Sequence, residues 1–153
     1  MLILKTRRNR RADAGFTAME MLVVGAMLAI AAAIALPSYS GQVTRSRILG
    51  GIAVLSDHRT RMEQFFADRR TYVDDSGNCG IAPPAPSQGD AFELSCTATP
   101  RSYVYTATGI ADKGMRGFSY SIDEAGARTT VSVPRGWTLA PGCWTFRTDG
   151  SCV

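Results

Sequence analysis

Residues 15–36 read GFTAMEMLVVGAMLAIAAAIAL, and this stretch decides the fold of the N-terminal part of the chain. Apart from Thr17 and Glu20, none of the 21 side chains from residue 16 to residue 36 is polar. A helix of that length measures about 31 Å at about 1.5 Å per residue, close to the hydrocarbon thickness of a bilayer. The stretch therefore predicts a helix long enough to span a membrane.

The residues before this apolar run are strongly basic. Residues 1–15 hold five Lys and Arg side chains against Asp13. The 17 basic and 13 acidic side chains of the whole chain therefore leave 12 of each after residue 15. The excess charge is typical of a segment on the cytoplasmic side of a membrane helix. The balanced remainder disfavours a nucleic-acid partner, which stays open as an alternative.

An ordinary secretory signal peptide is a competing interpretation of the same run. A signal peptide would be followed by a small-x-small cleavage site. Here Ala33, Ala35 and Pro37 lie within a pattern that continues as helix. The acidic Glu20 is also unusual, because an ionised carboxylate costs roughly 2.5–3.5 kcal/mol at the centre of a bilayer.

Glu20 needs a positive partner, and cleavage of the chain would supply one. A cut between Gly15 and Phe16 creates an α-amino group on Phe16. Residues 16 and 20 are four apart, so on a helix they would share one face. The amine could then meet the Glu20 carboxylate of its own or a neighbouring chain. The alternative is that Glu20 is a charge tolerated at the membrane interface.

The segment Gly15-Phe16-Thr17-Ala18-Met19-Glu20-Met21 resembles the prepilin peptidase motif of type IV pilins and type II secretion pseudopilins. The resemblance implies that Gly15 ends a leader peptide, residues 1–15, and that Phe16 becomes the N-methylated first residue. It also implies that Glu20 directs addition of the subunit to a filament. Ala18 and Met19 depart from the usual Leu-Ile of the motif but stay apolar.

Pro37 follows the apolar run and has two interpretations. Proline inside a helix removes a hydrogen bond and kinks it, whereas at the first position of a helix it is favourable. The resemblance implies one continuous helix with a kink at Pro37. On that basis we expect a transmembrane and filament-core helix over residues 16–38 and an amphipathic helix over residues 39–70.

The amphipathic segment has apolar side chains at helical spacing with charges between them. The apolar positions are Ile48, Ile52, Leu55, Met62, Phe65 and Phe66. Gly50 and Gly51 weaken the helix, by roughly 1 kcal/mol each. We expect the apolar face to lie on a sheet, with Met62 and both phenylalanines in the core. His58 lies among charged residues and is predicted to be a solvated surface residue.

Residues 71–153 are predicted to form a globular head that begins with a Pro-rich and Gly-rich loop. Four segments alternate or are rich in β-formers, and Asp123–Gly126 is a candidate hairpin turn. The predicted strands are Phe92–Ala98, Tyr103–Thr108, Phe118–Asp123 and Thr129–Val133. The predicted fold class is α+β, a long N-terminal helix packed on a small four-stranded antiparallel sheet. The resemblance to type IV pilins implies this same fold.

All four cysteines, Cys79, Cys96, Cys143 and Cys152, follow the apolar run. Their even number in an exported segment indicates disulfides, and the absence of a CxxC pair disfavours a zinc site. Three connectivities are allowed. We favour the local pairs Cys79–Cys96 and Cys143–Cys152, which close short loops. The head pattern also resembles the PilE-type minor pilins of type IVa systems, which implies a low-copy subunit that primes or tips the pilus.

The leading functional hypothesis is a type IV pilus subunit without catalytic activity, metal or cofactor. It would sit in the inner membrane with its head in the periplasm and later in a surface pilus, acting in twitching motility, adhesion or DNA uptake. Its expected partners are other pilins, the prepilin peptidase/N-methyltransferase, the inner-membrane assembly platform and the membrane itself.

Two other functions stay open. The first is a type II secretion pseudopilin, which shares the leader motif. The second is a competence-pilus DNA receptor, which requires a basic stripe on the folded head. The candidate residues for that stripe are Arg101, Lys113, Arg116, Arg128, Arg135 and Arg147.

Overall fold

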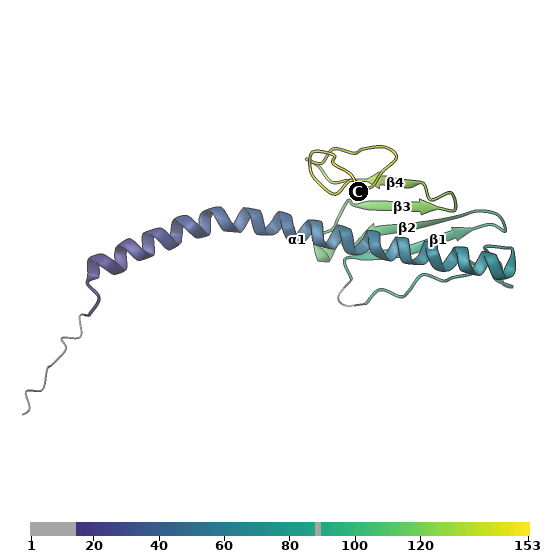
Figure 1. The fold of residues 1–153 in the computed structure, drawn as a ribbon, viewed down its shortest axis with the longest axis horizontal. Coiled ribbons are helices and arrows are strands. Elements are labelled where there is room, and N and C mark those ends of the chain that lie inside the picture. Colours follow the sequence, from purple (N-terminus) through teal and green to yellow (C-terminus); the bar gives the residue numbers. More distant parts are fainter. Residues whose placement is uncertain (1–14, 88–89) are drawn as a thin grey trace, which may run out of the picture. The chain divides into compact units, whose positions relative to one another are not determined.

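The computed structural model describes residues 15–87 and 90–153, and within helix α1 it leaves the side chains of residues 35–38 undescribed (Figure 1). The elements in chain order are α1 (Ala18–Arg69), β1 (Phe92–Ala98), β2 (Tyr103–Gly109), η1 (Ala111–Lys113), β3 (Ser119–Asp123) and β4 (Arg128–Ser132). The predicted α+β class, one long helix and a four-stranded antiparallel sheet, is confirmed.

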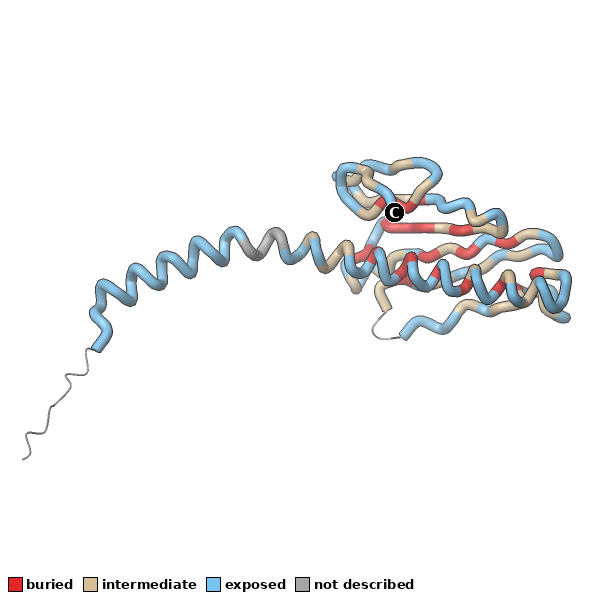
Figure 2. The backbone as a smooth tube through the Cα atoms, viewed as in Figure 1, coloured by how far each residue is buried: buried red, intermediate tan, exposed pale blue. Residues whose placement is uncertain are grey.

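The chain separates into two compact units, one up to Tyr39 and one from Ser40 to Val153. The first unit contains the apolar part of α1, which is long and apolar enough to cross a membrane. Its residues from Phe16 to Ile34 are exposed, as the colouring of the backbone in Figure 2 shows. α1 runs through Pro37. The predicted kink depends on residues 35–38, which lie outside those with described side chains.

In the second unit, the remaining part of α1 lies along the sheet (Figure 1). The predicted stripe is confirmed, because Ile48, Leu55 and Met62 are fully buried and Ile52 is 7% exposed. Phe65 and Phe66 pack against this core and are partly buried. The helix ends at Arg69, after which the backbone of Arg70 turns left-handed with φ 57°.

The prediction for His58 is wrong, because the side chain is only 7% exposed. His58 comes three residues after Leu55 and four before Met62, which places it on the buried stripe of α1. Its ring packs edge-on against Tyr105, with centroids 5.5 Å apart. Its Nδ1 lies 3.0 Å from the carbonyl oxygen of Val54, so this ring nitrogen has a hydrogen-bond partner in the helix backbone.

The sheet is an antiparallel meander in the order β1-β2-β3-β4. β1 has the predicted bounds, and the other strands differ from the predicted ones by one residue at one or both ends. The register shifts between Ser119 and Tyr120, where β3 pairs with β4. The irregularity lies at the end of this ladder where the predicted strands extend one residue too far, to Phe118 and Val133.

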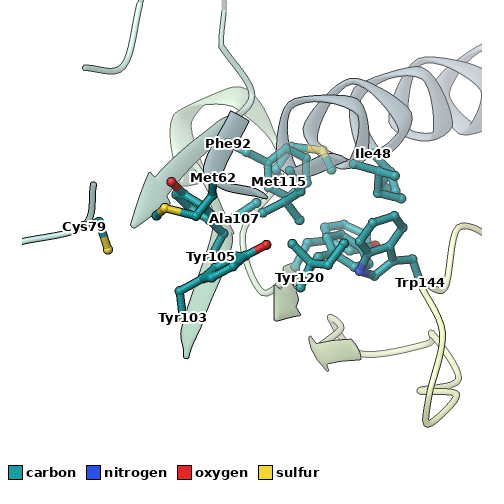
Figure 3. Close-up of a cluster of buried hydrophobic side chains, with 14 of the residues drawn as sticks. Ile48, Met62, Cys79, Phe92, Tyr103, Tyr105, Ala107, Met115, Tyr120 and Trp144 are labelled. Carbon is teal, nitrogen blue, oxygen red and sulfur yellow. The ribbon is translucent and has the colours of Figure 1, made fainter. Parts of the chain in front are cut away.

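Aromatic side chains fill the space between α1 and the sheet, as Figure 3 shows for Tyr103, Tyr105, Tyr120 and Trp144. The polar atoms of three of them tie loops or the C-terminal segment to the sheet. The hydroxyl of Tyr105 donates to the carbonyl of Ile81 at 2.6 Å. The hydroxyl of Tyr120 donates to the carbonyl of Thr145 at 2.8 Å, and Trp144 Nε1 donates to the carbonyl of Ser121 at 2.9 Å.

Two disulfides close loops of the head. They join Cys79 to Cys96 and Cys143 to Cys152, the two pairings favoured from the sequence. The first links the loop after α1 to β1. The second closes the C-terminal segment, which holds no regular strand and pairs with itself through a bridge between Thr145 and Cys152.

Candidate assembly helix and charged surfaces of the head

The beginning of α1 is fixed by Thr17. The backbone N–H of Glu20 donates to Thr17 Oγ1 at 3.2 Å, and that of Met21 donates to the Thr17 carbonyl at 3.2 Å. Thr17 is thus the N-cap and Glu20 is the third helical residue, which is the Thr17 half of a capping box. A carboxylate in the first turn also interacts favourably with the helix dipole. The spacing Thr-x-x-Glu before an apolar run is the signal from which this helix start could have been predicted.

In the uncut chain, Phe16 lies before the first turn of α1. An N-cap residue generally has a non-helical backbone, so in the uncut chain the helical periodicity begins after Thr17. The expectation that residues 16 and 20 share a helix face concerns the chain cut after Gly15, and it stays a prediction. Pairing of a Phe16 amine with the Glu20 carboxylate of its own or a neighbouring chain likewise stays a prediction.

The residues at the predicted cleavage site are accessible. Gly15 and Glu20 are exposed, and the Phe16 side chain is 76% exposed. The other large apolar side chains of this segment are exposed as well: Met19, Met21, Leu22, Val23, Val24, Met27, Leu28, Ile30 and Ile34. A soluble surface rarely exposes so continuous an apolar face, which marks an interaction site with lipid or protein.

Glu63 forms a polar centre inside the head. Tyr103 donates a hydrogen bond to its Oε1 at 2.8 Å, and Tyr72 donates to its Oε2 at 3.2 Å. Burial, followed by the hydrogen bond and the charge of Glu63, raises the pKa of Tyr103 well above its ordinary value. Both tyrosines therefore stay protonated as donors. This network joins α1 to β2 and has a structural role.

The six cations proposed for a basic stripe do not form one surface. Arg101 lies in the β1–β2 turn and Arg128 begins β4, both at the end of the sheet where Ala98 pairs with Tyr103. Arg128 stacks on the Trp144 ring at 4.9 Å. The other four, Lys113, Arg116, Arg135 and Arg147, lie beyond the opposite ends of the strands or in the C-terminal segment.

These four join two arginines of α1. Arg45 lines the same hollow as Arg147. Arg47 Nη1 donates to the carbonyl of Lys113. Arg116 lines a second hollow together with Ser40, Gly41 and Thr44 of α1. The structure thus places cations on both flanks of α1 at the start of the head.

Within residues 15–87 and 90–153, no three His, Cys, Asp or Glu side chains lie close enough together to hold a metal ion. The four cysteines are all used in disulfides.

Residues 37–118, more than half of the chain, match the family described as "Type IV minor pilin ComP, DNA uptake sequence receptor". The type IV major alpha-pilin of Moraxella bovis is 27% identical over 150 residues, covering 92% of this chain and 88% of that protein. Fimbrial protein EcpC of Eikenella corrodens is 30% identical over 73 residues, so the chain matches 48% of that protein's length. A solved type IV pilin from Shewanella oneidensis is 15% identical and covers 62% of this chain and 98% of that one, with a TM-score of 0.44.

Proposed function

The chain belongs to the type IV pilins, within the family described as type IV minor pilin ComP, and from that premise we propose that it is a minor subunit acting in pilus assembly or initiation. The observation that supports this role is an exposed apolar helix joined to a separately folded head. We further propose that the chain has no catalytic activity. Twitching motility, adhesion or DNA uptake would then follow from the filament.

The apolar part of α1 has two environments that remove it from water. Burying one Leu, Ile, Phe or Met side chain contributes about 1.5–3 kcal/mol. In the inner membrane, lipid covers this surface, with the head in the periplasm. In the pilus, the helices of neighbouring subunits cover it. Moving the helix from the membrane to the pilus replaces lipid contacts with protein contacts, so its apolar surface stays out of water throughout.

Leader removal supplies the charge that makes the second state specific. We propose that the prepilin peptidase cuts after Gly15 and methylates Phe16. The new amine of one chain then pairs with Glu20 of a neighbouring chain when the inner-membrane platform adds the subunit. An isolated carboxylate in an apolar bundle is costly, and pairing offsets that cost.

A pair of substitutions separates this role of Glu20 from its place in the first turn of α1. Glu20→Gln keeps a residue suited to the capping box and removes the charge, so we expect normal cleavage and membrane insertion but a loss of about tenfold or more from sheared pili, equivalent to about 1.4 kcal/mol or more. Intact-mass analysis of the mature chain measures cleavage, and quantitative mass spectrometry of sheared pili measures incorporation.

Thr17→Ala is the matched variant, because it removes the cap and keeps the charge. Glu93→Gln, in the exposed part of β1, controls for the loss of an acid elsewhere. If Glu20→Gln enters pili as well as the native chain does, the charge pairing is refuted. A mature terminus anywhere other than Phe16 would refute the leader assignment.

The proposal that this chain is a minor subunit is tested by measuring its abundance in the filaments. We expect this chain at far lower abundance than the major subunit of the same filaments, with loss of piliation when its gene is deleted. Equal abundance would make it a major pilin. A type II secretion pseudopilin remains the alternative, and it predicts that deletion stops exoprotein release and leaves twitching intact.

A DNA receptor is a second candidate function, favoured by the description of the family that the chain matches. The test is binding of duplex DNA to the full-length chain at several salt concentrations. Contact with Z phosphates gives a slope of log affinity against log salt of about −0.9Z. Removing the cations at each end of the head separately would locate the surface. A slope near zero would exclude this function.

A further inference from the structure

The cations at the start of the head form a defined surface, which we call the basic end. Its members are Arg45, Arg47, Lys113, Arg116, Arg135 and Arg147. They come from α1, from the β2–β3 connection and from the segments that follow β4, so the fold gathers them from distant parts of the sequence. Arg45 and Arg147 share one hollow, and Arg116 lines another beside α1.

Two of the acids in this part of the head accept hydrogen bonds from the backbone. Asp90 accepts from the Ser87 N–H at 2.6 Å, and Asp149 accepts from the Ser151 N–H at 2.8 Å. These hydrogen bonds lower the pKa of both carboxyls, so both stay charged. With Glu93 and Asp112 they make four acids against six cations, which leaves the basic end with a net positive charge.

Apolar side chains accompany the cations in both hollows. Leu49 and Phe146 lie beside Arg45 and Arg147, and Trp137 lies beside Arg116. Leu49 is 44% exposed. Basic residues mixed with Trp and aliphatic side chains are typical of surfaces that meet the headgroup layer of a membrane.

The chain tethers the basic end close to the apolar helix. Arg45 follows Leu36, the last residue of the apolar run, by nine positions. Nine residues span about 14 Å as a helix and at most about 32 Å when extended. Whenever the apolar run is in a bilayer, Arg45 is therefore held near its surface.

We propose that, while the chain is stored in the membrane, the basic end binds the anionic phospholipid headgroups of the leaflet from which the head emerges. The inference rests on the proposed storage of the subunit in the inner membrane. Phosphate oxygens would accept from Arg45 and Arg147 on one flank of α1 and from Arg116 on the other. Release from this surface then accompanies extraction of the subunit into a filament.

A membrane fits the basic end better than DNA does. Both offer phosphates, but only the lipid layer also offers an apolar environment for the exposed side chain of Leu49. The short segment between Leu36 and Arg45 also keeps the basic end at a high effective concentration of lipid headgroups, whereas DNA must be captured from solution.

The experiment uses the full-length chain in nanodiscs of phosphatidylcholine, with or without phosphatidylglycerol. Hydrogen exchange of peptides covering residues 40–49, 113–117 and 145–149 reports contact with the leaflet. We expect protection only in discs with phosphatidylglycerol, and loss of that protection at high salt. One basic side chain near an anionic leaflet changes binding about fivefold.

The variant Arg45→Gln/Arg116→Gln/Arg147→Gln should weaken binding about 100-fold, the product of three such effects. The matched control, Arg61→Gln/Arg69→Gln/Arg101→Gln, removes the same charge from exposed positions away from the basic end and should keep the protection. Thermal unfolding in phosphatidylcholine discs checks that both variants fold.

Equal protection in both disc types, or equal loss in the control variant, would overturn the proposal. Protection of the same peptides by duplex DNA in phosphatidylcholine discs, with none from phosphatidylglycerol, would overturn it in favour of a DNA site. Failure of the chain to enter discs would refute membrane storage and this proposal together. If the leaflet contact is found but sheared pili lack the chain, the pilus function fails and the lipid contact stands.

Discussion

Tyr105 shows how single residues of the head combine packing with a polar tether. Its ring is fully buried on β2, and its hydroxyl holds the Ile81 carbonyl of the loop after α1. Burial raises the pKa of Tyr105 to about 12, above the ordinary value of 10.0. The aromatic alternation of β2 predicted the buried ring. The hydroxyl's partner could not be predicted, because Ile81 is 24 residues away in an irregular loop.

The sign of this shift gives a pH dependence. Because the folded state favours the neutral phenol, its contribution to stability is complete below about pH 10 and is lost as the pH rises through about 12. We expect Tyr105→Phe to cost about 1 kcal/mol of unfolding free energy at neutral pH, through the lost hydrogen bond. The stability of Tyr105→Phe should then fall less steeply above pH 10 than that of the native chain.

Denaturant titrations followed by near-ultraviolet circular dichroism measure both effects, with the exposed Tyr39→Phe as control. Parallel pH profiles for Tyr105→Phe and the native chain would contradict the assignment.

His58 and Glu20 show what neighbouring residues in sequence can and cannot reveal. The charges around His58 suggested a surface, but its position three residues after Leu55 decided its burial. The apolar surroundings of Glu20 correctly identified it as an unusual residue. Predicting the N-cap would also have required noticing that Thr17 stands three positions before Glu20.

At the scale of elements, α1 contains a glycine pair with two different environments. A Cβ at Gly50 would meet nothing within 4 Å, whereas a Cβ at Gly51 would lie 2.6 Å from the ring of Phe92. Gly51 therefore permits the close approach of α1 to β1. The sequence indicated only that both glycines weaken the helix, because the contact with Phe92 depends on tertiary packing.

The two glycines make a matched pair of variants. Gly50→Ala should stabilise the head by up to about 1 kcal/mol, through higher helix propensity. Gly51→Ala gains the same propensity but must displace the buried Phe92 ring, and overpacking of a core costs about 1–3 kcal/mol, so we expect net destabilisation. Thermal unfolding of both variants in detergent measures the difference. If Gly51→Ala were as stable as Gly50→Ala, the close packing of α1 on β1 would be wrong.

Strands and helix were predictable where periodicity governs burial. β1 alternates over its full length and has the predicted bounds. The segment after β4 has no such alternation, and its order depends on long-range hydrogen bonds. Thr130 Oγ1 donates to the Cys143 carbonyl at 2.7 Å and accepts from the Thr145 N–H at 2.8 Å. Contacts of this kind leave no periodic pattern in a sequence.

At the scale of the whole molecule, both irregular parts of the head are closed by disulfides. The bridges Cys79–Cys96 and Cys143–Cys152 span 17 and 9 residues. In the chain-entropy description, a closed loop of this size contributes about 3 kcal/mol by restricting the unfolded chain. An oxidising compartment such as the periplasm is required for that contribution.

We expect Cys79→Ser/Cys96→Ser and Cys143→Ser/Cys152→Ser each to lose about 3 kcal/mol of unfolding free energy, with a small difference between them because the entropy depends on the logarithm of loop length. Urea titrations of the full chain in detergent provide the values. Reducing agent should bring the native chain below both variants. A variant with an unchanged urea midpoint would show that its bridge contributes no stability.

The N-cap at Thr17 has a consequence for maturation. The hydrogen bond that starts α1 joins two residues that both lie downstream of Gly15, so trimming the leader removes nothing that the first turn needs. On the proposed cleavage after Gly15, precursor and product would have the same helical register and would expose the same apolar surface to a neighbouring chain. Removal of the leader would then change the charge at the N-terminus of α1 and leave the conformation of the helix unchanged.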